Sequence, residues 1–83
     1  MRILYFAWVR ERIGKSEETL DLPNDVVTVA DLAGWLASRG DEYAAAFERP
    51  QFIRAAIDRV HVKPGTTIGN AKEIAFFPPM TGG

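Results

Sequence analysis

The spacing of apolar residues divides the chain into short strands and one clear helix. Residues 2–9 are apolar on both alternating sides, with Ile3 and Tyr5 on one side and Leu4 and Phe6 on the other. A strand without polar alternation is usually buried on both faces, so this run predicts a central strand. One helix covers one face of a small sheet. A partner protein could cover the other face; partial exposure of Tyr5 and its neighbours is the alternative.

Residues 28–39 carry the strongest helical pattern. Their apolar stripe comprises Val29, Leu32, Ala33, Leu36 and Ala37, the spacing of a helix packed on a core. Thr28 is the expected N-cap, and Asp31 three residues later completes a capping box with Asp in place of Glu. Trp35 is expected at the edge of the stripe. Gly40 suits the left-handed position that follows a helix.

Shorter segments complete the expected order. They are a helical turn at 10–13 ended by Gly14, a strand at 17–22, a helix at 41–48 ended by Pro50, and strands at 52–57, 60–62 and 73–77. Turn residues separate them at 23–25, 58–59, 63–65 and 69–70. In the last strand Ile74 and Phe76 share the face expected to be buried, and Phe77 lies on the other. This order predicts an α+β domain, a mixed sheet covered by one main helix.

Length, charge and cysteine content exclude several classes of function. Eighty-three residues form one domain with a modest core. A net charge of −1 with scattered arginines gives no nucleic-acid footprint. No apolar run approaches the roughly 20 residues of a membrane span, and no signal-peptide pattern is visible, so we expect a cytoplasmic protein without a membrane partner. Because the chain has no cysteine, any sulfur it carries cannot sit on a side-chain thiol.

Side-chain chemistry points to no self-sufficient active site. His61 is the single histidine, and without a cysteine or a second histidine we expect a structural or surface role for it. The carboxylates Glu17, Glu18, Asp41, Glu42 and Glu48 fall where solvated faces and caps are expected. The glycines at 65–69 lack the lysine of a phosphate-binding loop. We therefore expect no metal and no bound cofactor on this chain.

The end of the chain is its most specific feature. Pro78 has no N–H for a ladder, so the last strand should stop near it. The six residues from Pro78 to Gly83 reach roughly 20 Å when extended. The prolines favour an extended start, and Gly82 and Gly83 leave a thin tip with an unhindered carboxylate. We expect a domain over residues 1–78 and a tail over 79–83; a frayed end is the alternative.

Residues 76–83, Phe-Phe-Pro-Pro-Met-Thr-Gly-Gly, resemble the ending of the small subunits of molybdopterin synthase, a family of ubiquitin-like sulfur carriers. The opening run 3–7 followed by Arg10-Glu11-Arg12 is similar to the family's first strand, and the resemblance extends along the chain. Met80 departs from it, since a smaller aliphatic residue is common there. The resemblance implies a β-grasp, or ubiquitin-like, fold whose first and last strands are central and parallel.

The resemblance also implies a function for the tail. In the family an activating enzyme uses ATP to adenylate the terminal glycine, here Gly83, and a persulfide sulfur displaces AMP to leave a thiocarboxylate. The larger synthase subunit then accepts the sulfur onto a cyclic pterin intermediate, whose dithiolene binds molybdenum. This chain would be the non-catalytic, sulfur-donating subunit of a heterotetrameric transferase. Gly83 would be the reacting residue, and the partner contacts would be Phe77, Pro78, Pro79, Met80, Thr81 and Gly82.

Three other functions are compatible with parts of the pattern. A sulfur carrier for thiamine synthesis has the same fold and two terminal glycines. A ubiquitin-like modifier would transfer its carboxylate to lysines. A plain interaction domain would have no use for its tail. The Phe-Phe-Pro-Pro sequence at 76–79 favours the molybdopterin branch.

Overall fold

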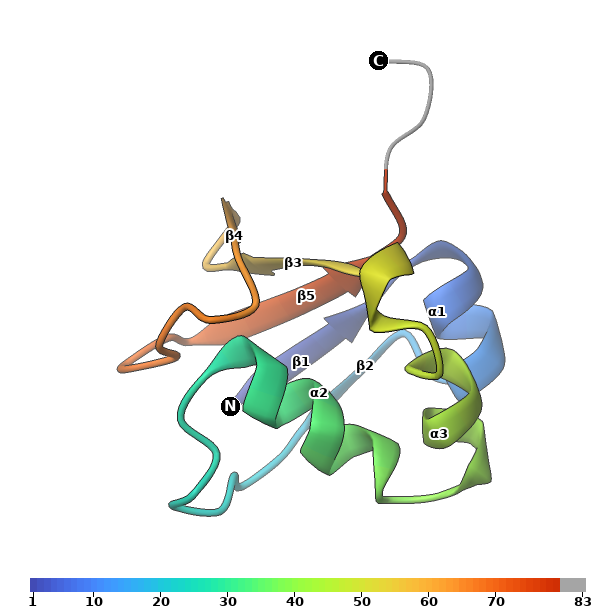
Figure 1. The fold of residues 1–83 in the computed structure, drawn as a ribbon, viewed down its shortest axis with the longest axis horizontal. Coiled ribbons are helices and arrows are strands. Elements are labelled where there is room, and N and C mark those ends of the chain that lie inside the picture. Colours follow the sequence, from blue (N-terminus) through green and yellow to red (C-terminus); the bar gives the residue numbers. More distant parts are fainter. Residues whose placement is uncertain (80–83) are drawn as a thin grey trace.

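The computed structural model describes residues 1–79, which form a five-stranded sheet packed against three α-helices (Figure 1). The elements in order are β1 (Arg2–Tyr5), α1 (Ala7–Ile13), β2 (Glu17–Thr19), α2 (Val29–Ala37), α3 (Asp41–Ala46), the short 3-10 helix η1 (Pro50–Phe52), β3 (Arg54–Ile57), β4 (Val60–Val62) and β5 (Glu73–Phe77). The predicted α+β class is confirmed, with α1 and α3 sharing the helical layer with α2.

The sheet has the order β2-β1-β5-β3-β4. β1 and β5 pair in parallel, with Ile3 opposite Ile74 and Tyr5 opposite Phe76. The other neighbouring pairs are antiparallel. β5 therefore has a strand on each side, and the prediction that the first and last strands are central and parallel is confirmed.

The predicted strand over residues 2–9 is wrong beyond Tyr5. Phe6 is extended, Ala7 takes a left-handed φ of 53°, and α1 begins there. The apolar run thus belongs to two elements: its spacing changes from two residues in β1 to the four residues that separate Val9 from Ile13, both buried. α1 ends as predicted at Gly14, whose φ is 85° and whose N–H donates to the Arg10 carbonyl over 2.8 Å.

The α2 helix has the predicted capping box. The Thr28 hydroxyl accepts from the Asp31 N–H over 3.1 Å, and the Asp31 carboxylate accepts from the Thr28 N–H over 3.0 Å. The prediction for Gly40 is wrong, because its φ of 169° is extended. Ser38 ends α2 with right-handed geometry, and its hydroxyl donates to the Trp35 carbonyl over 2.6 Å. Gly40 instead precedes α3 as its N-cap.

Several elements are shorter than predicted. β2 ends at Thr19, and β3 begins at Arg54. α3 ends at Ala46, and Pro50 begins η1 instead of ending α3.

The turns between the elements lie where the sequence predicts them. The Val26 N–H donates to the Pro23 carbonyl over 3.1 Å. Asp58 and Arg59, with φ of 46° and 72°, form the tight turn between β3 and β4.

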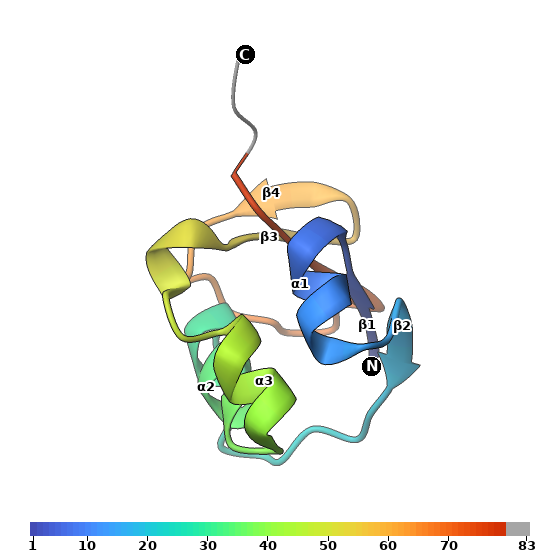
Figure 2. The same ribbon diagram turned by 90° about the vertical axis from the view of Figure 1, so that its right-hand side faces the viewer.

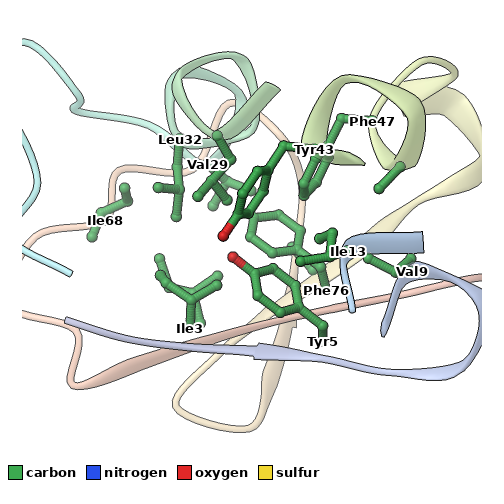
Figure 3. Packing of buried hydrophobic residues seen from close by; sticks show 14 residues of the cluster. Ile3, Tyr5, Val9, Ile13, Val29, Leu32, Tyr43, Phe47, Ile68 and Phe76 are labelled. Carbon is green, nitrogen blue, oxygen red and sulfur yellow. The ribbon is translucent and has the colours of Figure 1, made fainter. Parts of the chain in front are cut away.

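The core fills the space between the sheet and the helices. The largest side chains with almost no exposed surface are Tyr5, Phe76, Ile3, Leu32, Leu36, Ile74 and Val9. Figure 3 shows Tyr5 from β1 pointing toward Tyr43 from α3, with the Phe76 ring close beside them. Tyr5 is 1% exposed, so the alternative of partial exposure is wrong for Tyr5 itself. It is right for its neighbours, because Leu4 is half-buried and Phe6 is 46% exposed. The helices of residues 1–79 pack on one face of the sheet, and none of them packs on the opposite face (Figure 2).

Candidate functional site: an open sheet face and the base of the tail

The face of the sheet opposite the helices carries an apolar centre, here called the open face. Its residues follow from strand register and alternation: they are Leu4, Ala56, Ala75 and Phe77, with Arg54 and His61 beside them. Leu4 pairs with Ala75, and Ala75 pairs with Ala56 across the central strands. Side chains of paired residues project on the same face of a sheet, so these groups form one continuous surface.

The two phenylalanines of β5 lie on opposite faces, as predicted. Phe76 is 1% exposed, and its ring meets the Phe47 ring edge-to-face with centroids 5.1 Å apart. Phe77 is half-buried, and its ring lies 5.1 Å from the His61 ring, centroid to centroid, at a tilt of 51°. His61 is exposed on β4, in agreement with its predicted surface role. Phe77 therefore marks the open face next to the end of β5.

The tail starts at this same point. The last ladder contacts of β5 include the Phe76 carbonyl, which accepts from the Phe6 N–H over 3.1 Å. Pro78 and Pro79 follow, half-buried and without N–H groups to extend the ladder. In Figure 1 this red segment leads away from α2 and α3. The structure thus brings Phe77, Pro78 and Pro79 together; Met80, Thr81, Gly82 and Gly83 lie outside the described residues.

Charge differs between the two ends of the open face. At the start of β5, Arg2 forms ion pairs with Glu17 over 2.6 Å and with Glu73 over 3.5 Å. The hydrogen bond from Arg2 lowers the pKa of Glu17. At the end of β5, Arg54 lies opposite Phe77, and its guanidinium donates to the Gln51 carbonyl over 3.3 Å. Within residues 1–79 the end nearest the tail is therefore the more cationic one.

The expectation that Glu18 is solvated is wrong. Its side chain is 11% exposed and accepts four hydrogen bonds. One carboxylate oxygen accepts from the hydroxyls of Tyr5 over 2.8 Å and Tyr43 over 2.7 Å. The other accepts from Lys15 and Arg39, over 3.2 Å each. We call these five residues the Glu18 cluster; it lies on the helical side of the sheet.

Burial and hydrogen bonding act in opposite directions on Glu18. Burial alone would raise the pKa of the carboxylate, but the bonds from Tyr43, Tyr5, Arg39 and Lys15 outweigh it and lower the pKa to about 2. Burial, aided by the bond to Glu18, raises the pKa of Tyr5. One feature of the sequence could have predicted this cluster. A tyrosine in the core needs a hydrogen-bond partner for its hydroxyl group. The cluster is structural because it joins β1 and β2 to the helices.

The described side chains limit what this domain can do by itself. Residues 1–79 contain no group of three or more metal-ligating side chains close enough to hold an ion. None of the helices in that range is long and apolar enough to cross a membrane. What the geometry does offer is an apolar sheet face beside Pro78 and Pro79, where the predicted tail begins. That combination suits docking of a protein that receives the end of the chain.

Comparison with known proteins finds relatives that match this chain along its whole length. The ThiS family matches residues 3–83. The molybdopterin synthase sulfur carrier subunit of Haemophilus influenzae is 36% identical over 83 residues, which cover 100% of this chain and 99% of that protein. The Escherichia coli subunit of the same name is 34% identical with the same coverage. A third protein of that name, from Mycosarcoma maydis, is 34% identical over 87 residues, 92% of its length.

Solved structures match the fold. Small archaeal modifier protein 1 from Haloferax volcanii has a TM-score of 0.72 at 22% identity, covering 96% of this chain and 97% of that one. A putative molybdopterin converting factor, subunit 1, from Pyrococcus furiosus has a TM-score of 0.73 at 22% identity, covering 95% of each chain. At these identities the likeness concerns the fold, and the predicted β-grasp architecture is confirmed.

Proposed function

Because this chain belongs to the ThiS family, we propose that it is the sulfur-carrying small subunit of a molybdopterin synthase. The observation that carries this proposal is the similarity, over the full length, to proteins named as that subunit in two bacteria. The tail sequence Phe-Phe-Pro-Pro at 76–79 supports the same branch over a thiamine-type carrier.

The proposed chemistry takes place on the carboxylate of Gly83. A carboxylate is a poor electrophile at neutral pH, so an activating enzyme first couples it to ATP and forms an acyl-adenylate. The outer sulfur of a persulfide then displaces AMP and forms an acyl disulfide. A second thiol cleaves the S–S bond of this intermediate, which yields a disulfide on the donor and leaves the thiocarboxylate on Gly83. In the pocket of the larger subunit this sulfur passes to a cyclic pterin intermediate. Glycine suits each step, because the missing Cβ leaves the carbonyl open to attack and lets the tip enter a narrow channel.

The described fold supports this use of the tail. β5 pairs with a strand on either side, so the point where the tail begins is held firmly. Pro78 and Pro79 restrict the next two backbone positions to extended conformations, which reduces the entropy lost when a partner orders the tail. If fully extended, the six residues from Pro78 to Gly83 could reach roughly 20 Å. The domain can therefore dock outside a catalytic pocket while the tip reaches inside.

The open face supplies the docking surface in this proposal. Its apolar centre of Leu4, Ala75 and Phe77 adjoins the tail, so one partner can hold both at once. The larger synthase subunit and the activating enzyme would each use it in turn. By the resemblance, the synthase would contain two copies of each subunit.

Intact-protein mass spectrometry tests the proposal. The chain is incubated with ATP, the activating enzyme and a persulfide donor, and fragmentation locates the modification. We expect the mass change of one oxygen-to-sulfur exchange, at Gly83. Transfer to the pterin intermediate in the presence of the larger subunit would separate this function from a thiamine-type carrier. Isopeptide-linked adducts without any thiocarboxylate would instead assign the chain as a protein modifier and contradict the proposal.

A further inference from the structure

One basic side chain of the open face stands next to Phe77, where the tail begins. Arg54, the first residue of β3, is the register partner of Phe77, the last residue of β5. Paired residues project on the same face of a sheet, so the Arg54 side chain leaves its strand on the open face. The His61 ring of β4 lies 5.1 Å from the Phe77 ring, centroid to centroid. Phe77 is therefore bordered by Arg54 and His61.

The Arg54 guanidinium is held in place but keeps most of its donors. Within residues 1–79 it donates one hydrogen bond, to the Gln51 carbonyl over 3.3 Å. A guanidinium has five N–H donors, arranged in a fork that matches a carboxylate. Arg54 is exposed, and no carboxylate of the described residues forms an ion pair with it. The open face thus presents a charged group that can bind an acceptor from another protein.

The two arginines at the opposite end of the central strands differ from Arg54. Arg2 forms ion pairs with Glu17 over 2.6 Å and with Glu73 over 3.5 Å. Arg59, in the turn between β3 and β4, lies 3.8 Å from the Glu73 carboxylate. Both charges are therefore matched within the described domain. Arg54 has no such match, and it is the one of the three that lies beside Phe77.

From this arrangement we propose that the protein receiving the tail places a carboxylate of its own against Arg54. The inference rests on the proposed function, because it takes the open face as the docking surface. Apolar groups of the partner cover Phe77, and the partner's carboxylate accepts hydrogen bonds from the guanidinium beside it. An ion pair at the border of an apolar contact is partly shielded from water, which strengthens it and fixes the orientation of docking.

The position of Arg54 limits its role to orientation. If fully extended, the six residues from Pro78 to Gly83 could place the terminal carboxylate roughly 20 Å away. The ion pair then lies outside the pocket that receives the tip. Arg54 is thus a positioning residue, and its loss should weaken docking without changing the chemistry at Gly83.

Calorimetric titration with the larger synthase subunit, at low and high ionic strength, gives the first test. Arg54→Gln should weaken binding at least about tenfold at low ionic strength and reduce its dependence on salt. The matched control is Arg59→Gln, because Arg59 is an arginine at the other end of β3 whose side chain is 91% exposed. Its binding should equal that of the wild type, and both variants should keep the wild-type melting temperature.

A cross-link gives the second test, which does not depend on affinity. A carbodiimide joins an amine directly to a carboxylate that touches it. Arg54→Lys keeps the charge and adds an amine at position 54. In complex with the larger subunit, it should form a cross-link from position 54 to an Asp or Glu of that subunit, identified by peptide mass spectrometry. Arg59→Lys should form none.

Three results would overturn this inference while leaving the proposed function intact. They are wild-type binding by Arg54→Gln, an equal loss of binding in Arg59→Gln, and no cross-link from position 54 in a complex that forms normally. Failure of the wild type to bind the larger subunit would contradict the proposed function together with this inference. Failure to load sulfur on Gly83, with binding and the cross-link as expected, would contradict the proposed function alone.

Discussion

At the scale of single residues, Glu18 has the most concentrated set of interactions in the described domain. Four donors from three parts of the fold meet at one carboxylate: Tyr5 in β1, Lys15 before β2, and Arg39 and Tyr43 near α3. Hydrogen bonds to a charged group contribute more than neutral ones, and loss of the acceptor leaves buried hydroxyls unsatisfied. Glu18 therefore links the edge strand to the helices.

Glu18→Gln should destabilise the fold by about 1–3 kcal/mol, because the neutral amide loses the charge that all four donors share. The effect should depend on pH. The folded pKa of about 2 lies below the ordinary value of 4.5, so ionised Glu18 adds stability above pH 4.5 that is lost as pH falls toward 2. Chemical unfolding at pH 7 and pH 2.5 measures this. The difference between wild type and Glu18→Gln should shrink at the lower pH; an equal difference at both would contradict the ionic role.

Phe77 allows partner binding to be separated from stability. It is half-buried on the open face, whereas its neighbour Phe76 lies in the core. Phe77→Ala should weaken binding to the larger subunit or the activating enzyme at least about tenfold, with a small change in melting temperature. Phe52→Ala is the matched control, since Phe52 is a 48% exposed phenylalanine that belongs to η1 and not to a strand of the open face. A large loss of stability with intact binding would show that Phe77 serves the fold.

At the scale of elements, α2 stabilises the domain through one buried stripe. Leu32 and Leu36 are fully buried against the sheet, one helical turn apart. The capping box sets where the helix begins, but the stripe supplies its apolar contacts with the core cluster. A short helix of nine residues would be marginal by itself, so its stability comes from this packing.

Leu36→Ala should therefore cost about 2–5 kcal/mol, as truncations of buried leucines do. In a domain with roughly 5–15 kcal/mol of stability this is a large fraction. Urea unfolding followed by circular dichroism measures it. Val27→Ala, at a position 50% exposed just before the helix, is the control and should change little. An unchanged midpoint for Leu36→Ala would mean that its burial contributes no stability.

At the scale of the whole molecule, the fold and the proposed sulfur chemistry are separable. Every buried residue of the described core lies between Ile3 and Phe76. The ladder of β5 ends at Phe77, beyond which the prolines donate no hydrogen bonds. Changes at the tip should thus affect function without affecting the domain.

Deleting Gly83 should leave the melting temperature unchanged and abolish sulfur loading. The shortened tail ends one residue, roughly 3.5 Å, before the activating centre, and even small misplacements of a reacting group can cost about a hundredfold in rate. Gly83→Ala should be milder, because its methyl group only crowds the carbonyl. Thermal unfolding and the mass-spectrometric loading assay measure the two effects. Equal loading of the truncated chain would contradict the proposed role of Gly83.

Local sequence determined the features whose partners lie close along the chain. The capping box joins Thr28 to Asp31, three residues apart. Gly14 ends α1 by a bond to Arg10. Alternation over β5 assigned Phe76 to the core and Phe77 to the open face. Each of these depends on backbone periodicity and short-range hydrogen bonds, which a sequence pattern records directly.

Tertiary structure decided the features that need distant partners. β1 stops at Tyr5 because the chain turns at Ala7, which has a left-handed backbone conformation. The sequence gives no sign of this turn, because the position is not a glycine. Glu18 is buried because Tyr43, 25 residues away, and Tyr5, 13 residues away, converge on it. Such contacts form only when β1 and β5, the two ends of the described chain, pair at the centre of the sheet.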